Sequence, residues 1–312
     1  MSELIVYTHK DCLKKYNGPN HPEKKERLET VIKSISDLNF PNIKILENSL
    51  GKLEDIYLVH PKEYIENIFK MIPKNGIISL EKEPYADTFL CPNTKNSILA
   101  SFGSGICAAN SIFNNDINGI FCAVRPPGHH AETNRANGFC FVNNIAITAK
   151  YLRKKFSIKK IGILDFDVHH CNGTQEIFYN DKDTFCGSIH EFPLFPGTGT
   201  ENEKGIGNIF NAPIRSKTGS KIFIDTFRNK VLYELDKFKP EIILISAGFD
   251  AHKNDKISSI RLESKDYYTI TKDIIDLSQT HCNGKIISFL EGGYDLKSLY
   301  ESIQYHITAF IK

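Results

Sequence analysis

The sequence has no strong excess of either charge and no uninterrupted apolar run that approaches bilayer length. Its 39 Lys and Arg residues nearly balance 37 Asp and Glu residues, and a formal net charge of +2 gives no global field to attract nucleic acid or an anionic membrane. The N-terminus also lacks a charged leader followed by a long apolar core. These absences predict neither a nucleic-acid partner nor a membrane partner.

Regularly spaced cysteine pairs are missing too. Several cysteines lie within apolar runs, where a thiol behaves as a small hydrophobic group. This usage suits a reducing compartment, so we predict a cytoplasmic protein. The eight cysteines are Cys12, Cys91, Cys107, Cys122, Cys140, Cys171, Cys186 and Cys282.

No internal repeat and no low-complexity linker divides the 312 residues, of which 41% are hydrophobic. A chain of this length can bury one large core, so we predict a single domain over residues 1–312. Its oligomeric state is not predictable from the sequence.

Apolar strand-like runs alternate with segments of helical periodicity along the chain. This alternation predicts an α/β fold with a largely parallel sheet covered on both faces, and a ligand site beyond the carboxyl ends of its strands. The predicted strands are 3–7, 43–46, 120–124, 158–164, 184–189, 242–246 and 285–290. The predicted helices are 22–35 (capped by Asn20), 62–72, 94–113, 143–155, 175–179, 221–238, 264–279 and 297–311, and residues 190–219 are predicted to form a long irregular loop.

The central stretch is the predicted strand 158–164, whose apolar residues are followed by two carboxylates and two imidazoles. Because side chains on an extended segment repeat with period two, Asp165, Asp167 and His169 project to one side. Three such groups can chelate one ion, or two can bind it while the third holds a neighbour. The alternative is a set of solvated loop carboxylates and helix-capping histidines, which would crowd like charges without a cation.

Other strands also end in polar residues, and these ends should converge on one site. Asp167, His169 and Asp250 would offer two oxygens and one nitrogen to a metal and leave a position open. Such a set suits Zn(II), with Fe(II) or Co(II) as alternatives. Asp250 alone could instead be a turn or helix-capping residue.

The tandem His129 and His130 follow a rigid Pro-Pro-Gly loop, and the pair indicates general acid and base work. Asp165 could orient one imidazole and Asn172 the other, which would give the two rings different protonation states. Tyr294 follows two glycines and could donate a hydrogen bond to a developing oxyanion. Together these groups predict metal-assisted hydrolysis of an amide, without a Ser or Cys nucleophile.

Six motifs in this order resemble the histone deacetylase family, closest to its class II and bacterial deacetylase-like members. The motifs are Arg-Pro-Pro-Gly-His-His-Ala (125–131), Gly-Phe-Cys-Phe-Val-Asn-Asn (138–144), Asp-Phe-Asp-Val-His-His (165–170), Phe-Pro-Gly-Thr-Gly (195–199), Ser-Ala-Gly-Phe-Asp-Ala (246–251) and Glu-Gly-Gly-Tyr (291–294). The resemblance implies the arginase/deacetylase fold, with a mostly parallel eight-stranded sheet and helices on both faces. It also implies a zinc-dependent amidohydrolase that acts on acyl-lysine in a protein or peptide.

The same resemblance assigns roles residue by residue. It makes Asp167, His169 and Asp250 the zinc ligands and His130 the general base and acid. Its other catalytic assignments are His129, paired with Asp165, as the electrostatic partner; Asn172 as the partner of His130; and Tyr294 as the transition-state phenol.

The resemblance also implies how the substrate and a second ion bind. Phe139 and Phe195 would wall a narrow tunnel, the carbonyl of Gly138 would accept a hydrogen bond from the substrate nitrogen, and Arg27 would lie at the floor of the pocket. Structural potassium would use the carboxylate of Asp165, Ser188 and the backbone carbonyls of Asp167 and His169.

Four departures from the family pattern bear on function. Cys171 replaces the usual glycine, and Asn172 stands where class I members carry Asp, as it does in class II. Residues 252–257 lack the usual Gly-Asp-Pro, and Ile257 stands where a polyamine-preferring branch has Glu.

Three other functions remain as alternatives. An acetylpolyamine or other small acylated amine is the nearest alternative substrate. A two-manganese ureohydrolase would need further carboxylates where the sequence has Cys171 and His252. A non-enzymatic acyl-binding module would be expected to have lost Tyr294 or one of the paired histidines, and all are present.

Overall fold

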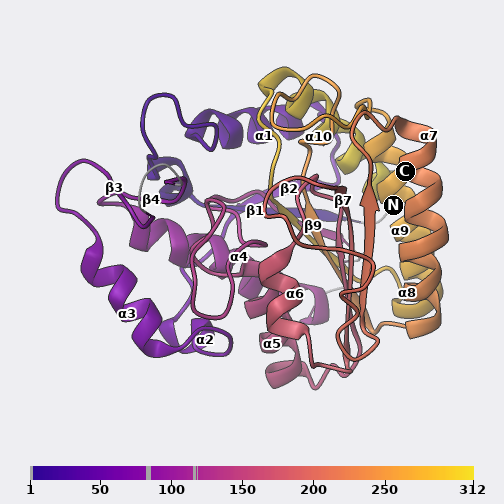
Figure 1. Cartoon of the computed structure of the whole chain (residues 1–312), viewed down its shortest axis with the longest axis horizontal. Coiled ribbons are helices and arrows are strands. Elements are labelled where there is room, and N and C mark those ends of the chain that lie inside the picture. Colours follow the sequence, from indigo (N-terminus) through magenta and orange to yellow (C-terminus); the bar gives the residue numbers. More distant parts are fainter. Residues whose placement is uncertain (1–2, 82–85, 115–116, 118) are drawn as a thin grey trace.

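The structure is a computed structural model that describes residues 3–81, 86–114, 117 and 119–312 (Figure 1). The strands are β1 (Leu4–Thr8), β2 (Ile43–Glu47), β3 (Ile78–Ser79), β4 (Phe89–Leu90), β5 (Gly119–Cys122), β6 (Ile161–Asp165), β7 (Thr184–Glu191), β8 (Ile209–Ile214), β9 (Ile242–Ala247) and β10 (Ile286–Leu290). The α-helices are α1 (Lys25–Asp37), α2 (Leu53–Ile56), α3 (Lys62–Met71), α4 (Thr94–Asn114), α5 (Asn144–Phe156), α6 (Asn172–Phe178), α7 (Ser220–Thr226), α8 (Tyr233–Phe238), α9 (Asp266–Cys282) and α10 (Leu296–Ile311). A 3-10 helix, η1 (Lys10–Lys14), and a π-helical segment, η2 (Phe227–Leu232), complete the described elements.

Eight strands form one sheet in the order β2-β1-β5-β10-β9-β6-β7-β8, and every neighbouring pair is parallel. Its central strands β6, β9 and β10 are buried along their whole length and rich in Ile and Leu, as expected for a parallel sheet covered on both faces. The predicted parallel eight-stranded sheet is therefore confirmed.

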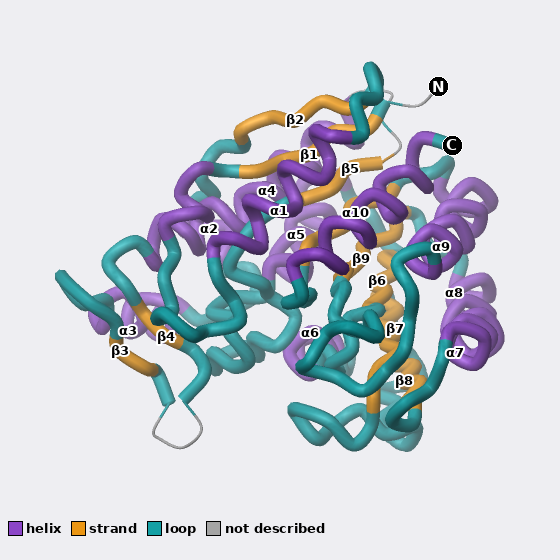
Figure 2. The backbone as a smooth tube through the Cα atoms, turned by 90° about the horizontal axis from the view of Figure 1, so that it is seen from above, coloured by secondary structure: helices purple, strands orange, loops and turns teal. Residues whose placement is uncertain are grey.

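Helices cover the sheet from two sides (Figures 1 and 2). One group consists of α1, α9 and α10, in which α10 packs against both α1 and α9, with α7 beside α9. The other consists of α4 and α5, with α6 packed against α5. Among the described residues, no helix combines the length and apolarity needed to cross a bilayer.

The four strands β5, β10, β9 and β6 lie side by side in the middle of the sheet. The polar clusters predicted to converge follow these same four strands, with His129 after β5, Asp167 after β6, Asp250 after β9 and Tyr294 after β10. Because the strands are parallel, their carboxyl ends meet at one edge, and this edge carries the candidate site.

Each predicted strand overlaps an observed one, but two local predictions are wrong. The predicted irregular loop 190–219 contains β8, whose residues Asn211 and Pro213 interrupt the apolar pattern. Proline is tolerated there because β8 is the last strand of the sheet. The first helix begins at Lys25 rather than Pro22, and Asn20 does not cap it, since residue 24 holds the N-cap position.

Candidate metal centre and active site

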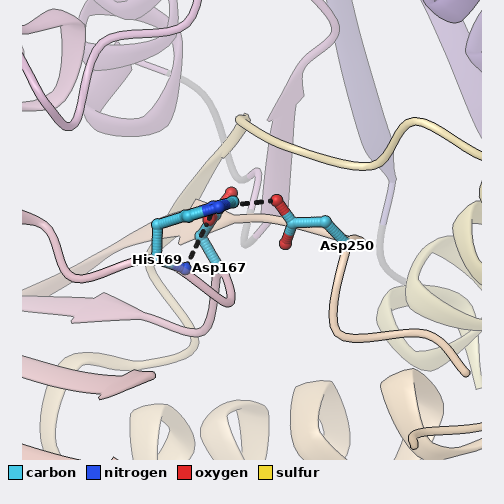
Figure 3. Close-up of side chains that lie close together, drawn as sticks. All are labelled: Asp167, His169 and Asp250. Carbon is cyan, nitrogen blue, oxygen red and sulfur yellow. Dashed lines mark hydrogen bonds and ion pairs between the residues drawn. The ribbon is translucent and has the colours of Figure 1, made fainter. Parts of the chain in front are cut away.

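Asp167, His169 and Asp250 form a buried cluster whose ligand atoms all lie within 4.8 Å of one another. The first two follow β6 and the third follows β9, and their side chains point toward one another (Figure 3). The imidazole Nδ1 of His169 lies 3.0 Å from Asp167 Oδ1 and 3.3 Å from Asp250 Oδ2. We call these three residues the Asp-His-Asp cluster.

Two observations show that the cluster fits a cation. Asp250 Oδ2 is buried without a hydrogen-bond donor, although an unpaired buried carboxylate oxygen is costly. Two glycines keep the space beside it open, because a Cβ on Gly292 would lie 2.0 Å from Asp250 Oδ2 and one on Gly248 would lie 2.1 Å from Asp167 Oδ2. Two carboxylates and one imidazole are ligands that zinc accepts.

Electrostatics in the cluster also favour positive charge. Burial would lower the pKa of His169, but its hydrogen bond to Asp167 and the nearby charge of the Asp250 carboxylate raise that pKa to about 10. Burial and the neighbouring Asp167 carboxylate raise the pKa of Asp250 to about 6. The two carboxylates therefore share the single positive charge of His169. A bound divalent ion would offset the charge of both carboxylates.

The paired histidines lie next to the cluster with ring centroids 3.9 Å apart, yet they have different partners. His129 Nδ1 donates to Asp165 Oδ2 over 2.9 Å, and His130 Nδ1 donates to Asn172 Oδ1 over 2.7 Å. Burial would lower the pKa of His129, but the carboxylates of Asp165 and Asp167 raise it to about 10. Burial and the positive charge of His129 hold the pKa of His130 well below its usual range.

A cavity of about 180 Å³ opens over these groups. Its volume is smaller than that of sites for drug-sized ligands, which are roughly 300–1,000 Å³. Its lining includes His129, His130 and His169, together with Pro127, Gly292 and Tyr294. The remaining lining residues are Asp87, Gly138, Phe139, Phe195 and Ile257.

A family model described as "Histone deacetylase domain" matches residues 21–310. This chain belongs to the histone deacetylase family. A probable deacetylase from Archaeoglobus fulgidus is 36% identical over 300 residues, which cover 94% of this chain and 81% of that protein. The histone deacetylase-like amidohydrolase of Pseudomonas aeruginosa is 30% identical over 278 residues, or 88% of this chain and 71% of that protein. The crystal structure of the HDA15 HD domain matches with a TM-score of 0.90 and 29% identity, over 99% of this chain and 88% of that chain.

Membership of the histone deacetylase family supports a hydrolase, and the structure places the residues expected to bind its substrate. Phe139 and Phe195 stand on the wall of the cavity, the latter with its ring 5.0 Å from that of His130. Gly138 has φ +52°, and a Cβ there would lie 2.4 Å from His130 Cδ2. A side chain at residue 138 would therefore collide with the imidazole, and glycine is the residue that fits there.

Arg27 lies behind the site rather than on the cavity wall. It is fully buried, its Nε donates to the carbonyl of Gly293, and its guanidinium stacks 4.7 Å from the ring centre of Tyr294. It supports the turn that carries the phenol, and it is not among the residues that line the cavity. Burial raises the pKa of Tyr294 well above its usual range, so the phenol keeps its proton at neutral pH.

Two of the four residues expected to bind potassium lie side by side on β6 and β7, and the other two, Asp167 and His169, follow β6. Asp165 and Ser188 are register partners, and both are buried. The carboxylate of Asp165 already accepts hydrogen bonds from His129 and from the backbone of Asp167, while the hydroxyl of Ser188 pairs with His190. The potassium site stays a prediction.

Three buried acids near the site were not assigned roles from the sequence. Glu291 accepts hydrogen bonds from the backbone N–H groups of Gly128 and His129, and burial raises its pKa to about 7. Asp255 accepts one from the N–H of Tyr294 over 2.6 Å. Glu23 pairs with a buried arginine 102 residues away. The Glu-Gly-Gly-Tyr motif marks Glu291 in the sequence, but no local pattern marks the other two.

Proposed function

We propose that this chain hydrolyses acyl-lysine amides in proteins or peptides, with Zn²⁺ held by the Asp-His-Asp cluster. The observation that carries the proposal is the meeting of a cation-binding cluster, two differently protonated imidazoles and a phenol in one narrow cavity. When bound, the ion supplies Lewis-acid polarisation of a carbonyl oxygen.

His130 is the group suited to move a proton. Its Nδ1 donates to Asn172, so its Nε2 is free to take a proton from an attacking water and return it to the leaving amine. His129 keeps its proton, because its pKa is raised to about 10, and it stabilises negative charge that develops nearby. The Tyr294 hydroxyl donates to the developing oxyanion.

The side chains that line the cavity support a linear substrate. Aromatic side chains of Phe139 and Phe195 form walls that suit the methylene stem of lysine, and the carbonyl of Gly138 would accept a hydrogen bond from the amide nitrogen. The chain's similarity to a probable deacetylase and to a histone deacetylase-like amidohydrolase is consistent with this substrate class.

A small acylated amine is the second candidate, and one observation favours it. The carboxylate of Asp87 lines the same cavity and would attract a cationic polyamine. Ile257 opposes it, because an apolar side chain occupies the place where a second carboxylate would increase that attraction.

Release of the acyl group from a panel of substrates tests both candidates. The zinc-loaded chain is compared on an acetyl-lysine peptide, on longer acyl-lysine peptides and on acetylspermidine. We expect the peptide to be hydrolysed fastest, and Tyr294→Phe to lower kcat by about 10²–10³ with the zinc content unchanged. Tyr305→Phe, at an exposed tyrosine outside the cavity, is the matched control. Equal rates in wild type and Tyr294→Phe, or no turnover of any acylamide, would contradict the proposal.

A further inference from the structure

The partner of His130 is itself held by an acid. Asn172, at the start of α6, is buried, and its Oδ1 accepts from His130 Nδ1 over 2.7 Å. Its Nδ2 donates to Glu132 Oε1 over 2.8 Å. A continuous chain of two hydrogen bonds therefore joins the Glu132 carboxylate to the imidazole.

The carboxylate fixes which way the Asn172 amide points. A carboxylate accepts hydrogen bonds and cannot donate them when ionised, so the amide NH₂ must face Glu132. The amide oxygen is then left for His130, which must carry its proton on Nδ1. A reversed amide would place its oxygen against the carboxylate and lose the hydrogen bond to this charged group, and its NH₂ would face His130 Nδ1, which could then only accept.

The arrangement also supplies charge. His129 has a direct carboxylate partner, whereas His130 has an amide that is polarised by a carboxylate one hydrogen bond further away. Hydrogen bonds in such chains strengthen one another. A carboxylate therefore acts on His129 directly, and a carboxylate acts on His130 only through the Asn172 amide.

We propose that Glu132 is a positioning residue for His130: through Asn172 it fixes the imidazole tautomer that leaves Nε2 free toward the cavity. This inference rests on the proposed function, in which His130 moves the proton. Glu132 would thus fix the tautomer of His130 through Asn172, as a carboxylate hydrogen-bonded directly to the imidazole would.

The turn at residues 132–135 is held by contacts that do not involve the Glu132 carboxylate, so this charge can be removed while the turn is kept. The N–H of Glu132 donates to the carbonyl of Arg135, and Thr133 is held by the carboxylate of Glu176 on α6. Neither contact uses the Glu132 side chain. Glu132→Gln therefore keeps the turn and the side-chain shape, but Gln can present either its oxygen or its NH₂ to Asn172, so the amide is no longer fixed.

The test compares three variants of the zinc-loaded chain. Glu132→Gln should lower kcat on an acetyl-lysine peptide by about tenfold, with KM, zinc content and melting temperature unchanged. The exchanged pair, Glu132→Gln with Asn172→Asp, should restore kcat to within about threefold of wild type, because the Gln amide can donate to a carboxylate that then accepts from His130. Glu176→Gln, which removes a neighbouring charge from the same turn, should behave as wild type.

Either a Glu132→Gln variant with wild-type kcat, or a loss that the exchanged pair fails to restore, overturns the inference. A second measurement does not depend on turnover. The ¹⁵N shifts of the imidazole, assigned with His130→Ala, should show Nδ1 protonated in wild type and a mixture of tautomers in Glu132→Gln. If wild type hydrolyses no acylamide, the proposed function fails while these shifts still decide the role of Glu132, and unchanged shifts would contradict it.

Discussion

Glu23 is the buried acid whose replacement tests the electrostatics of the core most sharply. It is 1% exposed, and its carboxylate binds the guanidinium of Arg125 through both oxygens, with Arg125 Nη2 2.7 Å from Glu23 Oε2. It also lies 3.4 Å from Arg27 Nη1. Since Arg125 begins the loop that leads to the paired histidines and Arg27 stacks on Tyr294, this one carboxylate supports both sides of the site.

The contribution of the Glu23 carboxylate to the free energy of unfolding follows from its pKa and can be compared with a typical value for buried ion pairs. Burial alone would raise the pKa of Glu23, but the two guanidiniums lower it from an ordinary 4.5 to about 2. At about 1.4 kcal/mol per pKa unit, this difference corresponds to about 3 kcal/mol of stability. Removing one partner of a buried ion pair typically costs about 3–5 kcal/mol, which agrees.

Glu23→Gln should therefore lower the unfolding free energy by about 3 kcal/mol at pH 7, or the melting temperature by roughly 5 °C. Because the folded pKa is the lower one, the stabilisation is present above pH 4.5 and is lost as the pH falls from 4.5 toward 2. Chemical denaturation at several pH values should show the gap between variant and wild type narrowing over that window.

Glu29→Gln is the matched control, since this residue lies on α1, shortly after Glu23 in the chain, and its carboxylate pairs with Lys25 at the surface. An exposed pair contributes at most about 1 kcal/mol. If the two variants lost the same stability, or if the gap for Glu23→Gln stayed constant down to pH 2, the reasoning on the buried ion pair would be refuted.

Two further substitutions test the cavity. Gly292→Ala should weaken zinc binding at least about tenfold in a chelator competition, because the added Cβ would meet the carboxylates of Asp250 and Asp167. Gly219→Ala, where a Cβ meets no atom within 4 Å, is the control and should bind zinc as wild type does. Equal affinities in both variants would contradict the expectation. Ile257→Glu should shift the ratio of kcat/KM for acetylspermidine over an acetyl-lysine peptide about tenfold toward the polyamine, and an unchanged ratio would show that this side chain does not select the substrate.

The sequence predicts the centre of the sheet well because local pattern and tertiary environment agree there. The run 161–164 is apolar and short, it is buried on both faces, and the polar residues after it alternate with the period of an extended chain. Asp167 and His169 could therefore be placed near one another from spacing alone. Asp250 joins them because β9 pairs with β6 in parallel, which the alternation of strands and helices predicts.

The sequence fails where distant contacts override local signals. The segment before α1 resembles a helix start, but the Glu23 carboxylate that would support the first turn is bound to Arg125. The strand β8 could not be predicted, because it contains a proline and proline is tolerated in a sheet mainly at an edge strand. Glu132 and Asn172 are 40 residues apart, so no spacing rule indicates their hydrogen bond.

The position of the metal ion tests the central claim most directly. Crystals of the chain grown with zinc, measured on both sides of the zinc absorption edge, should show one strong anomalous peak within bonding distance of His169 Nδ1 and the carboxylates of Asp167 and Asp250. A peak elsewhere, or these three side chains turned apart with no peak between them, would contradict the account of the site.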